Sequence, residues 1–435
     1  MTDDEFLHPN QDGAADTRVS RRLLLAGTAA AGVTATAGCS SDAGDGTATR
    51  DGTATGTGAE GGEAATADTV YVFNTGDRTV SVVDVESDSV VGTADIGVTA
   101  SFPANQHAPG LTDAADDPLW LNVGRGVRGV AVGSLSEVAA VETGSGANWQ
   151  AVTPDGAHLI VSAREPAHRQ VRIDADPVSE SFGSVTAELD RTAEGGRGSN
   201  DGPGPCDVTV HPDGEYAYVP DLYGDTLTVL DVAAFEIATQ IDVPAVVGDA
   251  GKPWMGTVAP DGETLLVEHN EGSAGTESVW DTSDPAAPTE RVRLTADDGL
   301  GRRPLTSEIG PDSATGYVFT PGTNDVSVID LDAGTVTGRI DVGGSAFVGT
   351  WGPSHEKLYV PVQTENEVKV IDHESRSVTA TIPVGPRPYG ATAATVRPPE
   401  SALGESGPAS ESLRRRLAGE GTTYCIGNCA CGHEL

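Results

Sequence analysis

The sequence predicts an all-β fold, a seven-bladed β-propeller closed by a C-terminal strand, and three observations carry this prediction. Short alternating segments rich in Val, Ile and Thr recur along the body of the chain at a period of roughly forty residues. Each repeat contains aspartate-led turns, and the 55 glycines of the chain suit tight turns between short strands. Aromatic residues are only 5% of the chain, and a helical bundle is not expected.

The first 38 residues read as an export signal. The pair Arg21 and Arg22 opens a short run of Leu, Ala, Gly, Val and Thr that ends near Ala37. This run is too short to be a stable membrane anchor, so it is typical of a signal peptide. The paired arginines resemble a twin-arginine signal, and TAGC, which ends at Cys39, resembles a lipoprotein box in which the cysteine carries the lipid.

Residues 39–68 form a low-complexity segment of Gly, Ala, Thr, Ser and Asp. Such a composition cannot build a core, and it predicts a flexible tether that holds a domain away from the membrane. We therefore expect an exported protein that is anchored through a lipid on Cys39 to the outer side of the cytoplasmic membrane.

The repeats occupy residues 69–397. TLTVLDVAAFEIATQIDVP (226–244) and DVSVIDLDAGTVTGRIDVG (325–343) show the pattern of a strand, an aspartate-led turn and a second strand. A PDG turn, as at 212–214 and 260–262, precedes the aspartate turn in most units. Four short antiparallel strands per unit are typical of a propeller blade. The turn markers are Asp84, Gly133, Asp174, Asp231, Asp281, Asp330 and Asp372.

The first unit lacks an opening strand, and an unpartnered strand stands at the other end of the repeats. The segment that begins at Pro388 matches the openings of other units at Pro205, Pro253 and Pro304. We expect this C-terminal strand to complete the first blade and so remove the open edges of the ring.

Phrases such as YVFN (71–74), YVP (218–220) and LYVP (358–361), each followed by a polar loop and a strand, resemble the YVTN family of β-propellers. The resemblance implies a WD40-like propeller over residues 69–397. Relatives in that family include cell-envelope proteins, binding modules, and redox proteins whose propellers hold haem d1 or copper. The resemblance implies a fold and leaves the function open.

The charge of the chain excludes some partners. The formal net charge is -39, which would repel nucleic acid and anionic membrane surfaces. The acid is spread along the whole chain, and it is typical of haloarchaeal proteins that stay soluble in concentrated salt. We expect no nucleic-acid partner.

Strand order places the long loops and the connections between blades on one face of the disc, where ligand binding is expected. That face should hold histidines and charged side chains, and the starts of the inner strands should open around the channel mouth. One hypothesis is a copper or haem site made from His107, His269, Met255 and Cys206; the alternative is ordinary packing and solvated loops. The residues assigned to this face are His107, His168, His269, Arg164, Asp221, Tyr223, Glu268, Arg302, Arg303, Trp149, Cys206, Trp254, Met255 and Tyr389.

The tail, residues 398–435, ends in YCIGNCACGHEL. Cys425, Cys429, Cys431 and His433 form a complete ligand set for Zn²⁺ or a soft site for Cu(I). Outside the cell the same thiols can instead form disulfides.

The leading interpretation is a lipid-anchored surface propeller that binds a protein or a small molecule on its long-loop face, or acts as a scaffold. The alternative is an accessory metalloprotein in electron transfer or metal handling. No nucleophile motif or phosphate-binding glycine loop is present in the sequence, so an enzyme is the less favoured hypothesis.

Overall fold

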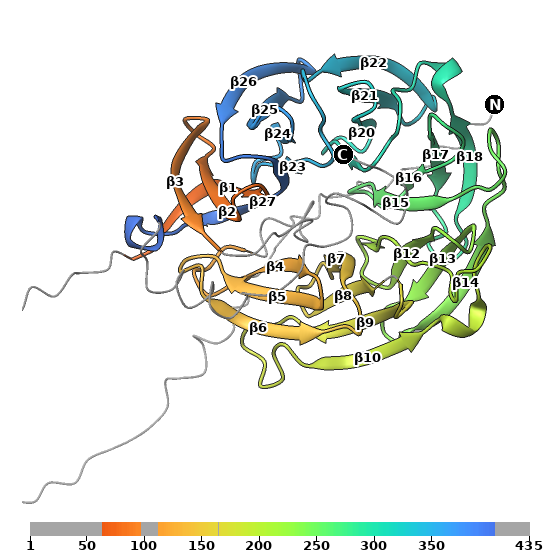
Figure 1. Ribbon diagram of the computed structural model, residues 1–435, viewed down its shortest axis with the longest axis horizontal. Coiled ribbons are helices and arrows are strands. Elements are labelled where there is room, and N and C mark those ends of the chain that lie inside the picture. Colours follow the sequence, from red (N-terminus) through yellow and green to blue (C-terminus); the bar gives the residue numbers. More distant parts are fainter. Residues whose placement is uncertain (1–62, 97–111, 164, 405–435) are drawn as a thin grey trace, which may run out of the picture. The chain divides into compact units, whose positions relative to one another are not determined.

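The computed structural model describes residues 63–96, 112–163 and 165–404. Within these ranges the chain forms seven small sheets around a central axis, which is a seven-bladed β-propeller (Figure 1). Helical structure in the described residues is limited to three short 3-10 turns, η2 (Thr192–Glu194), η3 (Ala296–Asp298) and η4 (Glu400–Ala402).

The first blade confirms the predicted ring closure. Strand β27 pairs antiparallel with β1, and their register runs from Ala65 opposite Arg397 to Asn74 opposite Pro388. The last strand of the repeats therefore becomes the inner strand of the first blade, which removes both open edges of the ring. The blade consists of β27 (Pro388–Arg397), β1 (Ala65–Asn74), β2 (Thr79–Asp84) and β3 (Ser89–Asp95).

Five further blades have four strands each, and the second blade has three within the described residues. The second blade is β4 (Pro118–Val123), β5 (Gly126–Ala131) and β6 (Glu137–Glu142). The third is β7 (Ala147–Val152), β8 (His158–Ala163), β9 (Arg169–Asp174) and β10 (Val185–Asp190). The fourth is β11 (Thr209–Val210), β12 (Tyr216–Asp221), β13 (Thr226–Asp231) and β14 (Glu236–Asp242).

The remaining three blades complete the ring. The fifth is β15 (Pro253–Val258), β16 (Thr264–His269), β17 (Thr276–Asp281) and β18 (Thr289–Leu294). The sixth is β19 (Ser307–Ile309), β20 (Thr315–Thr320), β21 (Asp325–Asp330) and β22 (Thr335–Asp341). The seventh is β23 (Thr350–Trp351), β24 (Lys357–Val362), β25 (Glu367–Asp372) and β26 (Ser377–Pro383).

The aspartates that mark the repeats in the sequence hold the turns together. The Asp231 carboxylate accepts a hydrogen bond of 2.7 Å from the backbone N–H of Ala234, and Asp330 does the same for Ala333 at 2.9 Å. Gly214 of a PDG turn has φ of 78°, a left-handed conformation in which glycine carries no steric penalty. These turns lie on one face of the disc, which we call the turn face.

The opposite face, called the long-loop face, carries the loops between the second and third strands and the connections between blades. Hydrophobic cores fill the spaces between neighbouring blades, as where Leu265 and Val267 of the fifth blade pack with Tyr218 and Leu227 of the fourth. Along the outer strands, exposed side chains instead alternate with partly buried ones. This alternation is strict in β14, as expected for a sheet edge in water.

Hydrogen bonds also link the inner strands from blade to blade. The Thr257 hydroxyl donates to the Ser307 carbonyl at 2.8 Å, and the Thr306 hydroxyl donates to the Phe347 carbonyl at 2.7 Å. These bonds fix the innermost strands next to one another around the axis, so residues at the strand starts hold constant positions.

Candidate functional site: the channel mouth

The inner strands begin on the long-loop face, and matching residues of successive blades meet there. Pro205, Pro253, Ala346 and Pro388 each lie opposite the last residue of the neighbouring second strand. The residue that follows each of them points into one shared apolar cluster. We call this set the channel-mouth cluster: Trp149, Cys206, Trp254, Met255, Leu305, Phe347 and Tyr389.

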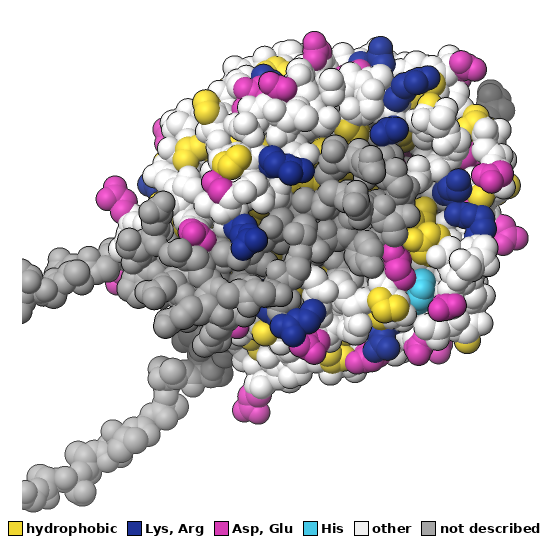
Figure 2. Space-filling model, viewed as in Figure 1, with side chains coloured by type: hydrophobic (Ala, Val, Ile, Leu, Met, Phe, Trp, Pro, Cys, Tyr) yellow, Lys and Arg dark blue, Asp and Glu magenta, His cyan; other side chains and the backbone are white. Residues whose placement is uncertain are grey.

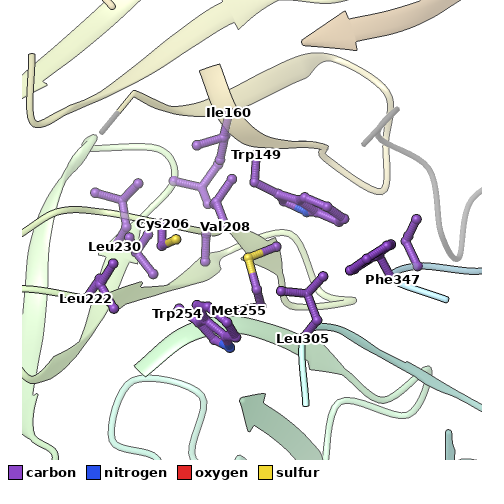
Figure 3. Close-up of a cluster of buried hydrophobic side chains, with 14 of the residues drawn as sticks. Trp149, Ile160, Cys206, Val208, Leu222, Leu230, Trp254, Met255, Leu305 and Phe347 are labelled. Carbon is purple, nitrogen blue, oxygen red and sulfur yellow. The ribbon is translucent and has the colours of Figure 1, made fainter. Parts of the chain in front are cut away.

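The channel-mouth cluster is aromatic and densely packed. In Figure 3, Trp149, Met255, Leu305 and Phe347 come from different blades and converge on the same region. The rings of Phe347 and Tyr389 are stacked, with centroids 5.1 Å apart and planes tilted by 15°. Aromatic faces arranged in this way can bind apolar or cationic groups of a ligand.

The sequence assigned Cys206, Trp254, Met255 and Tyr389 to the channel mouth, and these four residues lie in one cluster. Cys206 is buried and reduced, and the Asn148 side-chain amide donates to its backbone carbonyl and approaches its Sγ at 3.1 Å. Leu305 and Phe347 complete the set, and both occupy the same blade position as Trp254.

The two described histidines of the long-loop face serve as hydrogen-bonding residues inside the protein. His269 is fully buried at the end of β16, with Nδ1 3.0 Å from the Gly251 carbonyl and Nε2 2.7 Å from the Ser278 hydroxyl. Burial and the nearby Arg293 lower the pKa of His269 well below its usual value. His168 is also buried, and its Nδ1 accepts a hydrogen bond of 3.2 Å from the Gly204 N–H.

Next to the channel-mouth cluster, the fifth blade departs from the repeat. Glu268 on β16 lies directly opposite Glu277 on β17, and Met255 on the inner strand is the partner of Glu268. Both glutamates are fully buried. The same pair of positions is apolar in four other blades: Phe73 with Val80, Pro220 with Leu227, Phe319 with Val326, and Pro361 with Val368.

The two glutamates lack the partners that buried charges require. Neither carboxyl oxygen of Glu268 or of Glu277 has a hydrogen bond of normal geometry in the described part of the protein. Ser307 of the sixth blade lies beside Glu268 and offsets only part of the effect of burial. Burial raises the pKa of Glu268 to about 8.

Three more buried carboxyls are coupled electrostatically to Glu268. Burial raises the pKa of Glu277, Glu308 and Asp207 well above the usual values, and the charge of Glu268 adds to each rise. Asp207 also joins two blades, because its Oδ2 accepts a hydrogen bond of 2.7 Å from the Gly256 N–H. Burial therefore favours the protonated form of all four carboxyls, and a protonated carboxyl is a hydrogen-bond donor.

In the fourth blade, by contrast, a buried charge is fully paired. Arg191 donates to both oxygens of Asp221, at 2.7 and 2.8 Å, and to both oxygens of Glu194, each at 2.8 Å. The hydroxyls of Thr226 and Thr228 donate to the same Asp221 carboxylate. The Arg191–Asp221 pair fixes the connection between the third and fourth blades.

Some residues predicted to act lie outside the described residues. They are His107 and Arg164, Arg21 and Arg22 of the export signal, the lipid site Cys39, and the tail residues Cys425, Cys429, Cys431 and His433. In the part of the chain that the structure describes, no group of three or more His, Cys, Asp and Glu residues is arranged to hold a metal ion. No helix among the described residues has the length and apolarity to cross a membrane.

Comparisons with known proteins support the fold. No family model matches the sequence, and no curated protein matches it. A functionally unknown protein from Desulfotomaculum acetoxidans DSM 771 superposes with a TM-score of 0.58 at 13% identity, covering 75% of this chain and 99% of that chain. The periplasmic gluconolactonase PpgL of Pseudomonas aeruginosa gives 0.58 at 17% identity, covering 75% and 99%.

Hydrazine synthase of Kuenenia stuttgartiensis is a third similar structure, with a TM-score of 0.56 at 16% identity, covering 74% of this chain and 99% of that chain. The two of these structures that are named for an activity, a gluconolactonase and a hydrazine synthase, have different ones, as expected for a fold that hosts many functions. The chain therefore has a seven-bladed propeller fold of the gluconolactonase-like kind.

Proposed function

We propose that the protein is a lipid-anchored cell-surface β-propeller that binds a ligand at the channel mouth of its long-loop face. The fold and the sequence of signal, tether and repeats motivate this assignment, together with the YVTN-like phrases and the acidic, haloarchaeal type of composition. Export by the twin-arginine route would place the domain on the outer side of the cytoplasmic membrane.

The burial of the Glu268–Glu277 pair is the main observation that supports a binding site at the channel mouth. Four blades keep apolar residues at these positions. Two buried carboxyls that have no hydrogen bond of normal geometry in the described part of the chain lower stability. Residues that break the local rules of a repeat at a cost in stability are expected at functional sites. Glu268 is the cross-strand partner of Met255, a member of the channel-mouth cluster, so carboxyl groups and aromatic side chains adjoin there, as in many ligand sites.

Native mass spectrometry of the full mature protein from its host tests the site. We expect a bound small molecule that is retained by the wild type and lost by the Trp254→Ala variant. The Phe235→Ala variant is the matched control, because Phe235 is a buried aromatic in the turn that follows β13 on the turn face. A mass equal to that of the lipidated polypeptide alone, under every preparation, would contradict the binding assignment.

The anchor is tested by cell fractionation. We expect Cys39→Ser to release the protein into the medium, because the lipid is proposed to be its attachment. Membrane retention of this variant would overturn the anchor.

Two other functions are separated by the same preparation. An accessory metalloprotein would contain copper, zinc or iron, with ligands in the tail or at the channel mouth. A purified protein that is colourless and free of metal, with its tail thiols reduced, would leave that alternative without support. An assay of δ-gluconolactone hydrolysis tests catalysis; we expect no acceleration over the buffer.

A further inference from the structure

Four arginines on the long-loop face have side chains without a partner among residues 63–96, 112–163 and 165–404. Arg78, Arg302, Arg303 and Arg387 are exposed, and their guanidinium groups have no hydrogen bond or ion pair within these ranges. Every other Lys and Arg side chain that the structure describes has one or the other, as with Arg125 and Glu142 or Arg376 and Thr315. In a chain with 65 acidic residues and only 26 Lys and Arg, unpaired arginines on one face need an explanation.

The backbone at these positions makes the choice of residue more unusual. Lys252, Arg303 and Arg387 each precede the proline that opens an inner strand, and their φ angles are 45°, 58° and 52°. Gly204, before the corresponding proline of the fourth blade, has φ of 68°. Glycine and asparagine adopt this left-handed region most readily, and other residues lose about 1 kcal/mol there. The backbone therefore does not call for a basic residue.

The loops fix these arginines in two pairs around the channel mouth. Arg302 and Arg303 are consecutive in the connection to the sixth blade. Arg387 lies beside the loop that carries Arg78, because the Thr75 N–H donates to the Arg387 carbonyl at 3.0 Å. The seventh blade lies between the two pairs in the ring. Figure 2 shows Lys and Arg side chains around the central region of this face, while most Asp and Glu side chains lie toward its outer edge.

We propose that Arg78, Arg302, Arg303 and Arg387 form a basic rim that binds oxyanion groups, carboxylate or sulfate, of a ligand with at least two negative charges. The inference rests on the proposed function only in placing the ligand on the long-loop face. Guanidinium groups pair with carboxylate and sulfate oxygens through two parallel hydrogen bonds. Such contacts are short, so they persist in salt that screens long-range attraction.

The ligand could be a free polyvalent anion or an acidic polysaccharide, which present the same groups. Titration calorimetry of the full mature chain separates these sources with citrate, sodium sulfate, chondroitin sulfate and neutral dextran as probes. We expect binding of citrate, of the sulfated polymer or of both, and no binding of dextran. Binding of the polymer alone would assign the rim to an extended chain, and binding of citrate would assign it to a free solute.

The decisive variant is Arg303→Asn with Arg387→Asn, because asparagine keeps the left-handed backbone and removes both charges. We expect at least tenfold weaker anion binding with an unchanged unfolding temperature. Arg376→Asn is the matched control, since Arg376 is exposed on the turn face with φ of 51°. Failure of every anionic probe, or an equal loss in the Arg376→Asn control, would overturn the proposal. The rim variants should still retain the small molecule that we expect in native mass spectrometry, so failure of the anion proposal and failure of the channel-mouth proposal can be told apart.

Discussion

The fourth and fifth blades both bury acidic side chains near the long-loop face, one register position apart, and the protein surrounds these side chains in opposite ways. In the fourth blade, Arg191 and Asp221 are both fully buried, and each exchanges several hydrogen bonds with the other and with its neighbours. In the fifth blade, Glu268 and Glu277 are equally buried without such bonds. The difference separates an ion pair that stabilises a connection between blades from two acidic side chains that the fold does not require.

Breaking the satisfied pair should have the largest effect. Arg191→Met leaves the Asp221 carboxylate buried without its cation, and we expect a loss of about 3–5 kcal/mol in the free energy of unfolding. Denaturant unfolding measures this loss. The double variant Arg191→Met with Asp221→Leu should recover most of it, because no buried charge is left without a partner and Glu194, which also loses Arg191, is exposed. A double variant as unstable as the single one would contradict this explanation.

The carboxyls of the fifth blade should make stability depend on pH. The pKa of Glu268 is raised to about 8 in the folded protein, so its contribution to stability is complete below the unfolded value near 4.5 and is lost as pH rises toward 8. One such group changes stability by at most about 1.4 kcal/mol per pH unit. Glu268→Gln should flatten the fall between pH 5 and 8 in thermal unfolding.

His269 provides a check with the opposite sign. Its pKa is lowered on folding, so its contribution is present above the unfolded value of about 6.5 and is lost as pH falls. A wild-type protein whose stability rises steadily from pH 5 to 8 would show that the histidine, and not the carboxyls, controls the dependence.

Restoring the repeat at the unsatisfied pair should stabilise the fifth blade. Glu277→Val installs the residue found at the matching position as Val80, Val326 and Val368. We expect a gain of about 1–3 kcal/mol at pH 8, since an unsatisfied buried polar group is removed. Glu263→Val, at an exposed turn position of the same blade, should change stability by less than about 0.5 kcal/mol. A destabilised Glu277→Val variant would contradict the view that the pair costs stability.

The fold was predictable because the turns are local. Asp231 and Gly214 determine their turns through hydrogen bonds and φ angles within a few residues, and such signals are visible in a sequence. The closing strand was predictable for a different reason. Its pairing is long-range, with Ala65 opposite Arg397, but the segment that begins at Pro388 repeats the opening of other blades.

The pairing of Glu268 with Glu277 was not predictable, because it depends on the register of β16 against β17 across the loop that joins them. The sequence HNEGSAGTE (269–277) indicates a long loop, whereas β16 continues to His269 and β17 already begins at Thr276. Glu277 is therefore inside a buried strand, and His269 is a buried hydrogen-bonding residue. Which arginines lack a partner is decided only when the chain folds. No sequence motif around Arg78 or Arg387 indicates that their side chains stay unpaired.

The smallest expected effect concerns the rim. Arg303→Asn removes an exposed charge without a partner and keeps a residue that tolerates the left-handed backbone, so thermal unfolding should shift by less than about 0.5 kcal/mol in free energy. Arg191→Met is expected to cost several times more, although each variant removes one arginine. A large destabilisation by Arg303→Asn would mean that this arginine supports the connection to the sixth blade, and the contrast between arginines held for structure and arginines free for a ligand would fail.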